Sequence, residues 1–180
     1  MDQPTLQRAK EGDPAARETL LRELQDPWYR LCCSLLRDAD LARDATQETA
    51  LRFLRRMGEF RGESTVMTWS MGIAINVVRE MRRARAGLGE AHDPPVARTT
   101  LMSATTSAPD DAAARSESTD RLREVLRDLP DRQREAIVLR FLQEMSVEET
   151  AVAMNCAEGT VKATVHQALR ALRGRLTHLM

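Results

Sequence analysis

Six polar and basic side chains near the C-terminus have the types and spacing of a surface that contacts nucleic acid. Gln and Thr hydrogen-bond to base edges, whereas Lys and Arg neutralise phosphates. No acidic residue follows Glu158, although Arg170, Arg173 and Arg175 lie beyond it. The alternative is an ordinary solvated helix face, in which these arginines complement the C-terminal end of the helix dipole. The candidate contact residues are Thr160, Lys162, Thr164, His166, Gln167 and Arg170.

A second basic cluster lies near the middle of the chain. Arg79, Arg82 and Arg83 stand close together and are opposed there only by Glu80. Just before them, Asn76 interrupts the apolar run Gly-Ile-Ala-Ile-Asn-Val-Val. An unpaired buried amide costs about 1–3 kcal/mol, so Asn76 must either find a partner inside a helical bundle or face outward and read a base.

Other reactive or polar residues favour structural roles. Trp28 and Trp69 lie on apolar helical faces and are expected to pack in the core. The three cysteines, among them the adjacent pair Cys32 and Cys33, form no C-x-x-C motif, and no histidine stands near them. We therefore expect small buried cysteines, no metal and no cofactor. The polar residues show no nucleophile–base spacing, so catalysis is not predicted.

The C-terminal elements that must position the first cluster form a helix-turn-helix pattern. Ser146 and Glu149 have capping-box spacing and begin a short helix that ends at Met154-Asn155, where Asn suits a left-handed turn. A last helix is expected from about Glu158 to Leu176, and its first turns would enter a major groove. Two amphipathic helices precede this unit. The apolar stripe of the first of these helices is Leu122, Val125, Leu126 and Leu129, and that of the second is Ile137, Val138, Phe141 and Leu142. The stripe of the last helix is Val161, Val165, Leu169 and Leu172.

The N-terminal part predicts a compact helical bundle. An Asp before a proline supplies an N-cap followed by a residue suited to the first helical position. One helix is expected to run from Asp38 to Met57, with Gly58 as its stop. The expected helix starts are Asp13-Pro14, Asp26-Pro27, Asp38 and Ser64.

Composition limits the class of protein. Aromatic residues make up only 3% of the chain, which favours helices over sheets. The 27 basic and 27 acidic side chains cancel, which argues against strong stand-alone binding to duplex DNA. No apolar run could span a membrane, and the first residues lack a secretory signal, so a cytoplasmic location is expected. Residues 87–118 are rich in Pro, Ser, Thr and Ala and predict a flexible linker between two small all-α domains, 1–86 and 119–180.

As a set, these residues resemble the extracytoplasmic-function (ECF) group of the sigma-70 family. In the first lobe, ARDATQETALRFL, FRGESTVMTW and GIAINVVREMRR are similar to the family's second conserved region in order and spacing. In the second lobe, LPDRQREAIVLRFLQEMSVEETAVAMNCAEGTVKATVHQALRALRGRL is similar to the fourth region. The second lobe alone also resembles the DNA-binding domain of LuxR-type regulators, but both lobes in this order are specific.

The resemblance implies an alternative sigma factor that binds core RNA polymerase, recognises −10 and −35 promoter elements and supports DNA melting. Asp44, Gln47 and Glu48 match the helix that docks on the β′ clamp helices, although without this context they would count as a solvated helix face. The segment 60–68 matches the loop that captures a flipped-out −10 base. The residues expected at the −10 element and its separated strand are Phe60, Arg61, Ser64, Thr65, Asn76, Arg79, Arg82 and Arg83.

The resemblance further implies that the last helix reads the −35 element. The residues expected to do so are Thr160, Lys162, Thr164, His166, Gln167 and Arg170. The family usually has arginine where Thr164 and Gln167 stand, so this recognition helix is less cationic. The implied partners are core RNA polymerase, through the β′ clamp helices and the β flap, promoter DNA and an anti-sigma factor. Membrane insertion and a small-molecule substrate are not expected.

Two other functions compete with this interpretation. A dimeric helix-turn-helix regulator would bind a palindromic site without polymerase, but the zero net charge and the lack of an obvious dimerisation helix count against it. A decoy that mimics a sigma factor without reading DNA would fit the two uncharged residues Thr164 and Gln167. An enzyme is the least favoured class.

Overall fold

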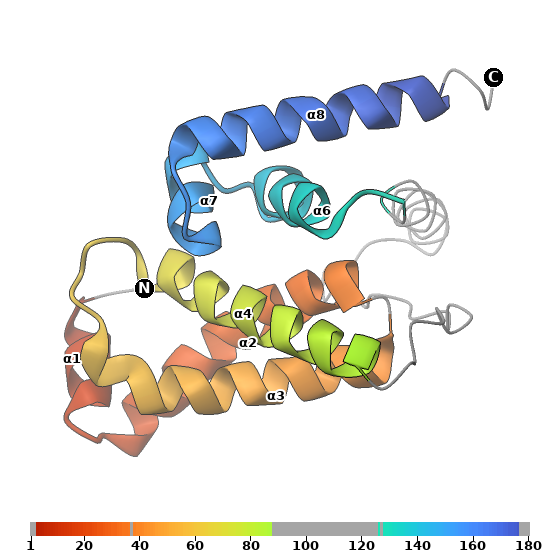
Figure 1. The fold of residues 1–180 in the computed structure, drawn as a ribbon. Helices are drawn as coiled ribbons and strands as arrows, with labels where there is room; N and C mark the ends of the chain where they lie inside the picture. The colour runs from red at the N-terminus through yellow and green to blue at the C-terminus, as the bar shows by residue number, and fades with distance from the viewer. Residues whose placement is uncertain (1–2, 37, 88–125, 127, 177–180) are drawn as a thin grey trace, which may run out of the picture.

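The computed structural model describes residues 3–36, 38–87, 126 and 128–176, and within these every regular element is a helix (Figure 1). The expected all-α class is therefore confirmed. Two layers are stacked in Figure 1: the N-terminal lobe (α1–α4) and the C-terminal lobe (α6–α8), with α8 outermost. The elements are α1 (Gln3–Lys10), α2 (Pro14–Leu36), α3 (Ala39–Arg56), the 3-10 helix η1 (Met57–Glu59), α4 (Val66–Gly87), α6 (Asp131–Ile137), the π-helix η2 (Val138–Leu142), α7 (Val147–Met154) and α8 (Glu158–Leu176).

Helix α2 runs unbroken through Pro27, so the expected helix start at Asp26-Pro27 is wrong. An interior proline costs about 3 kcal/mol because it lacks an N–H and crowds the preceding turn. The helix continues because one buried stripe spans the proline, and each large apolar side chain in it contributes about 1.5–3 kcal/mol. The stripe consists of Leu20, Leu24, Trp28, Leu31 and Leu35. At the other start, Asp13 caps α2 as expected, accepting from the backbone N–H groups of Ala15 and Ala16.

The caps of α3 and α4 agree only in part with expectation. The Asp38 carboxylate accepts from the N–H groups of Asp40 and Leu41, which confirms that α3 begins there. Helix α4 begins one residue later than expected, because Thr65 rather than Ser64 accepts the N–H of Thr68, at 3.0 Å. Gly58 does not stop α3 either, since the chain continues as the 3-10 helix η1.

Both tryptophans belong to an aromatic cluster at the centre of the N-terminal lobe, as expected. The Trp28 and Phe53 ring centroids lie 5.4 Å apart, and Trp69 bridges Phe53 and Phe60 at 5.7 and 5.3 Å. Trp28 also donates its indole N–H to Ser70 Oγ at 3.0 Å. Nearby, burial raises the pKa of the Cys32 thiol to about 12, which agrees with a structural cysteine.

The helix-turn-helix unit forms as its local sequence predicts. Ser146 Oγ accepts the N–H of Glu149, whose carboxylate accepts the N–H of Ser146 at 2.8 Å. That backbone hydrogen bond also lowers the pKa of Glu149. Asn155 ends α7 in the left-handed region, with φ 51°, and α8 starts at Glu158.

Two apolar stripes in the C-terminal lobe differ from expectation. The second helix changes from α to π geometry at Val138, and Phe141 and Leu142, both expected in its buried stripe, are 52% and 37% exposed. On α8, Leu169 is 43% exposed, and Ala168 is buried in its place beside the same stripe as Val161. The expected first helix of this lobe lies outside the described residues, apart from its end.

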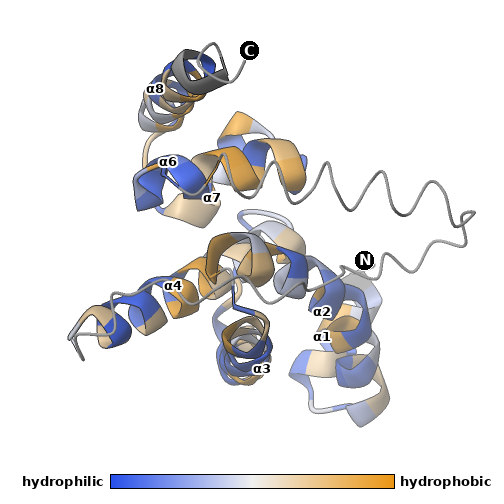
Figure 2. Cartoon of the chain, turned by 90° about the vertical axis from the view of Figure 1, so that its right-hand side faces the viewer, coloured by the Kyte–Doolittle hydropathy of each residue, from blue (hydrophilic) through white to orange (hydrophobic). Residues whose placement is uncertain are grey.

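The two lobes share one connected apolar core instead of standing apart. Helix α4 packs against α7, and η2 packs against α2. Figure 2 shows hydrophobic residues in the middle of α4, beneath the C-terminal lobe, and hydrophilic residues toward its far end. The expected linker, residues 87–118, lies outside the described residues except for Gly87.

Candidate nucleic-acid interface

Asn76 faces solvent although it stands in an otherwise buried stretch of α4. Its neighbours Ile75 and Val77 are buried, whereas Asn76 itself is exposed. Its Oδ1 accepts a hydrogen bond from Arg79 Nη1 at 3.3 Å. Of the two possibilities open from the sequence, the outward position is the one observed.

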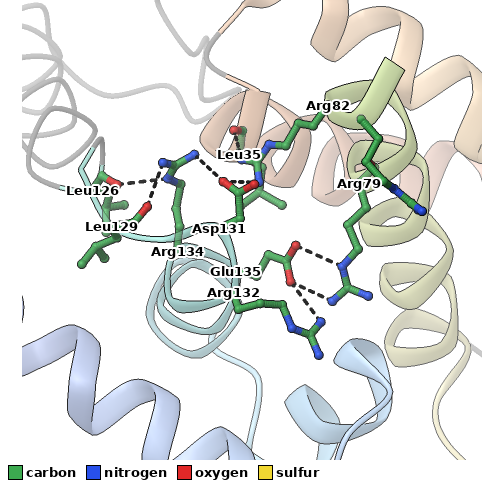
Figure 3. A network of polar contacts seen from close by, with 10 residues as sticks. Leu35, Arg79, Arg82, Leu126, Leu129, Asp131, Arg132, Arg134 and Glu135 are labelled. Carbon is green, nitrogen blue, oxygen red and sulfur yellow. Dashed lines mark hydrogen bonds and ion pairs between the residues drawn. The ribbon is translucent and has the colours of Figure 1, made fainter. Parts of the chain in front are cut away.

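Arg79 is bound by a carboxylate of the other lobe (Figure 3). Its Nε and Nη2 donate to the two oxygens of Glu135, at 3.0 and 2.7 Å, and Glu135 is only 1% exposed. Arg132 approaches the same carboxylate at 3.4 Å. A charge-assisted bidentate pair of this kind is among the stronger polar contacts in proteins, and it offsets the cost of burying the carboxylate.

Arg82 makes a second connection between the lobes. Its Nη1 lies 3.0 Å from Asp131 of α6, and its Nη2 donates to the carbonyl of Leu35 at the end of α2. Asp131 is also within 3.4 Å of Arg134, whose guanidinium caps carbonyls in its own lobe. Arg83, in contrast, is exposed and donates to the carbonyl of Arg79.

Small residues bring the two lobes into close contact at the other end of α4. A Cβ at Gly72 would meet the carbonyl oxygen of Ala153 at 3.3 Å, so α4 approaches the α7 backbone through a residue without a side chain. Thr68 is buried and donates to Glu149 Oε1 at 3.3 Å, which ties the start of α4 to the capping box of α7.

The loop before α4 has exposed residues along its outer side, and the residue at which it begins is buried. Arg61 and Thr65 are exposed, Ser64 is half-buried, and Gly62 has φ 79°, which favours glycine. Phe60 is 8% exposed and packs on Trp69, so in this structure it supports the loop from beneath. The residues expected at the −10 element therefore include exposed side chains, which a ligand could reach, and the buried Phe60, which holds the loop in place.

Helix α8 carries the residues expected at the −35 element on the outside of the molecule. Thr160, His166, Gln167 and Arg170 are exposed, and Thr164 is half-buried. Lys162 is exposed and lies 3.4 Å from Glu158 in the first turn. An exposed pair of this kind is worth little, so Lys162 is readily available to a phosphate.

The expected docking face of α3 is open as well. Asp44 and Gln47 are exposed, while the half-buried Glu48 accepts from Arg52 Nε at 2.6 Å. Leu51, one turn further along the helix, is 48% exposed beside these polar groups.

Several residues at these surfaces could not be identified from the sequence. Glu135 and Asp131 engage Arg79 and Arg82, and Lys10 of α1 contacts Phe60. Each pair is separated by about 50 residues, so no local pattern connects its members. Among the described residues, no group of His, Cys, Asp and Glu could hold a metal ion, and no helix is long and apolar enough to cross a membrane.

Two family models match the chain, and they match its two lobes separately. Residues 20–87 match "Sigma-70 region 2", and residues 119–172 match "Sigma-70, region 4". The first match contains the exposed faces of α3 and α4, and the second contains the helix-turn-helix unit.

Similar proteins cover nearly the whole chain. The RNA polymerase sigma-H factor of Pseudomonas aeruginosa is 29% identical over 99% of this chain and 95% of its own length. The ECF RNA polymerase sigma factor SigW of Bacillus subtilis is 29% identical over 97% of this chain and 96% of its own length. Among solved structures, the sigma factor RpoE in complex with the anti-sigma factor NepR, from Bartonella quintana, superposes with a TM-score of 0.68 and 23% identity, covering 89% of this chain and 96% of that one. That structural likeness concerns the fold alone.

Proposed function

Since this chain belongs to the ECF group of the sigma-70 family, whose members bind core RNA polymerase and recognise promoters, we propose how its lobes divide that work. The N-terminal lobe docks on the polymerase and reads the −10 element as single strand. The C-terminal lobe reads the −35 element as duplex. The observation that carries this assignment is the outward position of Asn76 at the start of a row of arginines.

In the N-terminal lobe, a flipped base is held against the exposed edge of the 60–68 loop. Bases in single strands are read in pockets, and cations follow the backbone between them. Asn76 contributes an amide at the fork, and Arg79, Arg82 and Arg83 neutralise strand phosphates. The neutral net charge fits this role, because the polymerase provides most of the affinity for DNA and the chain adds selective contacts.

In the C-terminal lobe, α8 enters the major groove with its exposed N-terminal half. Gln167 and Thr164 hydrogen-bond to base edges, and Lys162 and Arg170 contact phosphates. Helix α8 lies on the side of the C-terminal lobe away from the N-terminal lobe (Figure 1), which leaves this face accessible in the arrangement described.

Core polymerase docks on α3 through Asp44, Gln47 and Glu48, which contact the β′ clamp helices, and the C-terminal lobe contacts the β flap. An anti-sigma factor is proposed as a further partner, on the model of the related complex. The chain performs no catalysis of its own and takes no small-molecule substrate. It acts in the cytoplasm, where the polymerase transcribes.

Promoter binding requires the two lobes to separate. Arg79 and Arg82 are bound to Glu135 and Asp131 here, so strand phosphates must replace these carboxylates. A guanidinium binds phosphates as well as carboxylates in a bidentate manner, so strand phosphates can take over these contacts. Binding to polymerase and DNA must then offset the loss of the apolar contact between the lobes. Linked lobes that each bind weakly gain affinity when both elements are engaged together.

The test is transcription from a promoter library that is randomised at both elements, with purified core polymerase. Asn76→Ala is expected to lower base selectivity at the −10 element roughly tenfold, the value of one good base contact, and to leave −35 selectivity unchanged. Gln167→Ala should do the reverse. Each variant is the control for the other, and loss of selectivity at both elements by either variant would contradict the division of labour.

A further inference from the structure

We propose that Lys10 is a positioning residue for the −10 loop, which it holds in place from the N-terminal helix α1. This inference rests on the proposed function of the 60–68 loop. Lys10 lies outside the residues that either family model matches, 20–87 and 119–172. It would act through Phe60 and not by touching DNA.

The contact has two components. Lys10 Nζ donates a hydrogen bond to the backbone carbonyl of Phe60 at 2.8 Å, and the same ammonium lies 5.5 Å from the centre of the Phe60 ring. A cation over an aromatic face is attracted by the ring, and a hydrogen bond from a charged donor is stronger than a neutral one. Both components act on the residue at which the loop begins.

Lys10 is itself held in place. Leu6 and Ala9 of α1 are buried in the core of the lobe, and Arg17 of α2 donates to the carbonyl of Ala9 at 3.0 Å. The turn to α2 passes through Gly12, whose φ of 100° suits glycine. The lysine therefore extends from a well-anchored helix, so its contact can hold the backbone of Phe60 in position.

The loop is anchored at both ends, but the two anchors differ. At its end, Thr65 caps α4, and Thr68 is tied to Glu149 of the C-terminal lobe. That second tie is lost when the C-terminal lobe moves to the −35 element. The contact from Lys10 lies wholly within the N-terminal lobe, so it persists after the lobes separate and keeps the base of the loop in position during promoter opening.

The experiment compares Lys10→Met holoenzyme with the parent on the promoter library randomised at both elements. Methionine keeps a long apolar stem and removes the donor and the charge. We expect −10 selectivity to fall by at least about tenfold, as for the loss of one charge-assisted hydrogen bond, with −35 selectivity and affinity for core polymerase unchanged. Lys10→Arg, which keeps a charged donor, is expected to restore most of the selectivity.

Arg22→Met is the matched control, because it removes one exposed cation from the neighbouring helix α2. Unchanged −10 selectivity in Lys10→Met would overturn the proposal, and so would an equal fall in Arg22→Met. Parallel losses at both elements together with a lower melting temperature would also overturn it, since they would indicate a purely structural role. If the parent protein itself shows no −10 selectivity, the proposed function fails instead, which separates the two results.

Discussion

Polar residues in and before α4 differ in whether they contact the helix backbone. The Thr65 hydroxyl contacts the hydroxyl of Thr68 and accepts the Thr68 backbone N–H, whereas Asn76 contacts Arg79. The sequence indicates that each is polar in an apolar setting, but only packing decides which way a side chain points. Ser64 and Thr65 illustrate this, since both are good N-caps and differ by one position.

The capping assignment predicts different effects for these two neighbours. Thr65→Ala removes the acceptor for the Thr68 N–H and should lower the free energy of unfolding by about 1 kcal/mol. Ser64→Ala should change it by less than about 0.5 kcal/mol, as for an ordinary surface position. Urea denaturation of the two variants checks this, and a larger loss for Ser64→Ala would contradict the observed helix start.

At the scale of elements, local signals were reliable where they were unopposed. The capping box at Ser146, the left-handed Asn155 and the start of α3 at Asp38 all follow from residues within one turn of each other. The helix start expected at Pro27 is wrong because the buried residues on both sides of the proline stabilise one continuous helix by more than the proline destabilises it. Phe141 is exposed, against expectation, in a segment with π-helical geometry. Leu169 is exposed because the neighbouring Ala168 takes the buried position on α8.

Helix α2 offers a direct measurement of this competition. Pro27→Ala restores a backbone N–H inside the helix and should raise the free energy of unfolding by about 1–3 kcal/mol. Pro14→Ala is the control, since Pro14 stands at the first helical position, where proline is favourable. Equal effects of the two substitutions in thermal or urea unfolding would show that the interior position of Pro27 carries no cost.

At the scale of the whole molecule, the sequence indicated two lobes and their order but not their contact. The sequence predicts that Arg79 and Arg82 contact DNA, whereas in the structure they bind Glu135 and Asp131, which lie about 50 residues away in a different lobe. The close approach of Gly72 to Ala153 is equally invisible in the sequence. Long-range packing of this kind depends on the complete fold.

The contact between the lobes predicts that Glu135 competes with DNA for Arg79. Glu135→Gln keeps the shape of the side chain but removes its charge, so the free protein should bind a single-stranded oligonucleotide roughly tenfold more tightly. Fluorescence anisotropy measures this, with Glu148→Gln as the control, because that exposed residue lies in the same lobe and contributes the same charge. Equal gains in the two variants would reduce the effect to overall charge and contradict a specific competition.

Run-off transcription from a pool of genomic promoters measures whether this chain directs core RNA polymerase to promoters. Purified core polymerase is assayed with and without the protein, and the transcript ends are sequenced. We expect a defined set of start sites that depend on the protein and share elements at −10 and −35. Transcripts identical to those of core polymerase alone would contradict it.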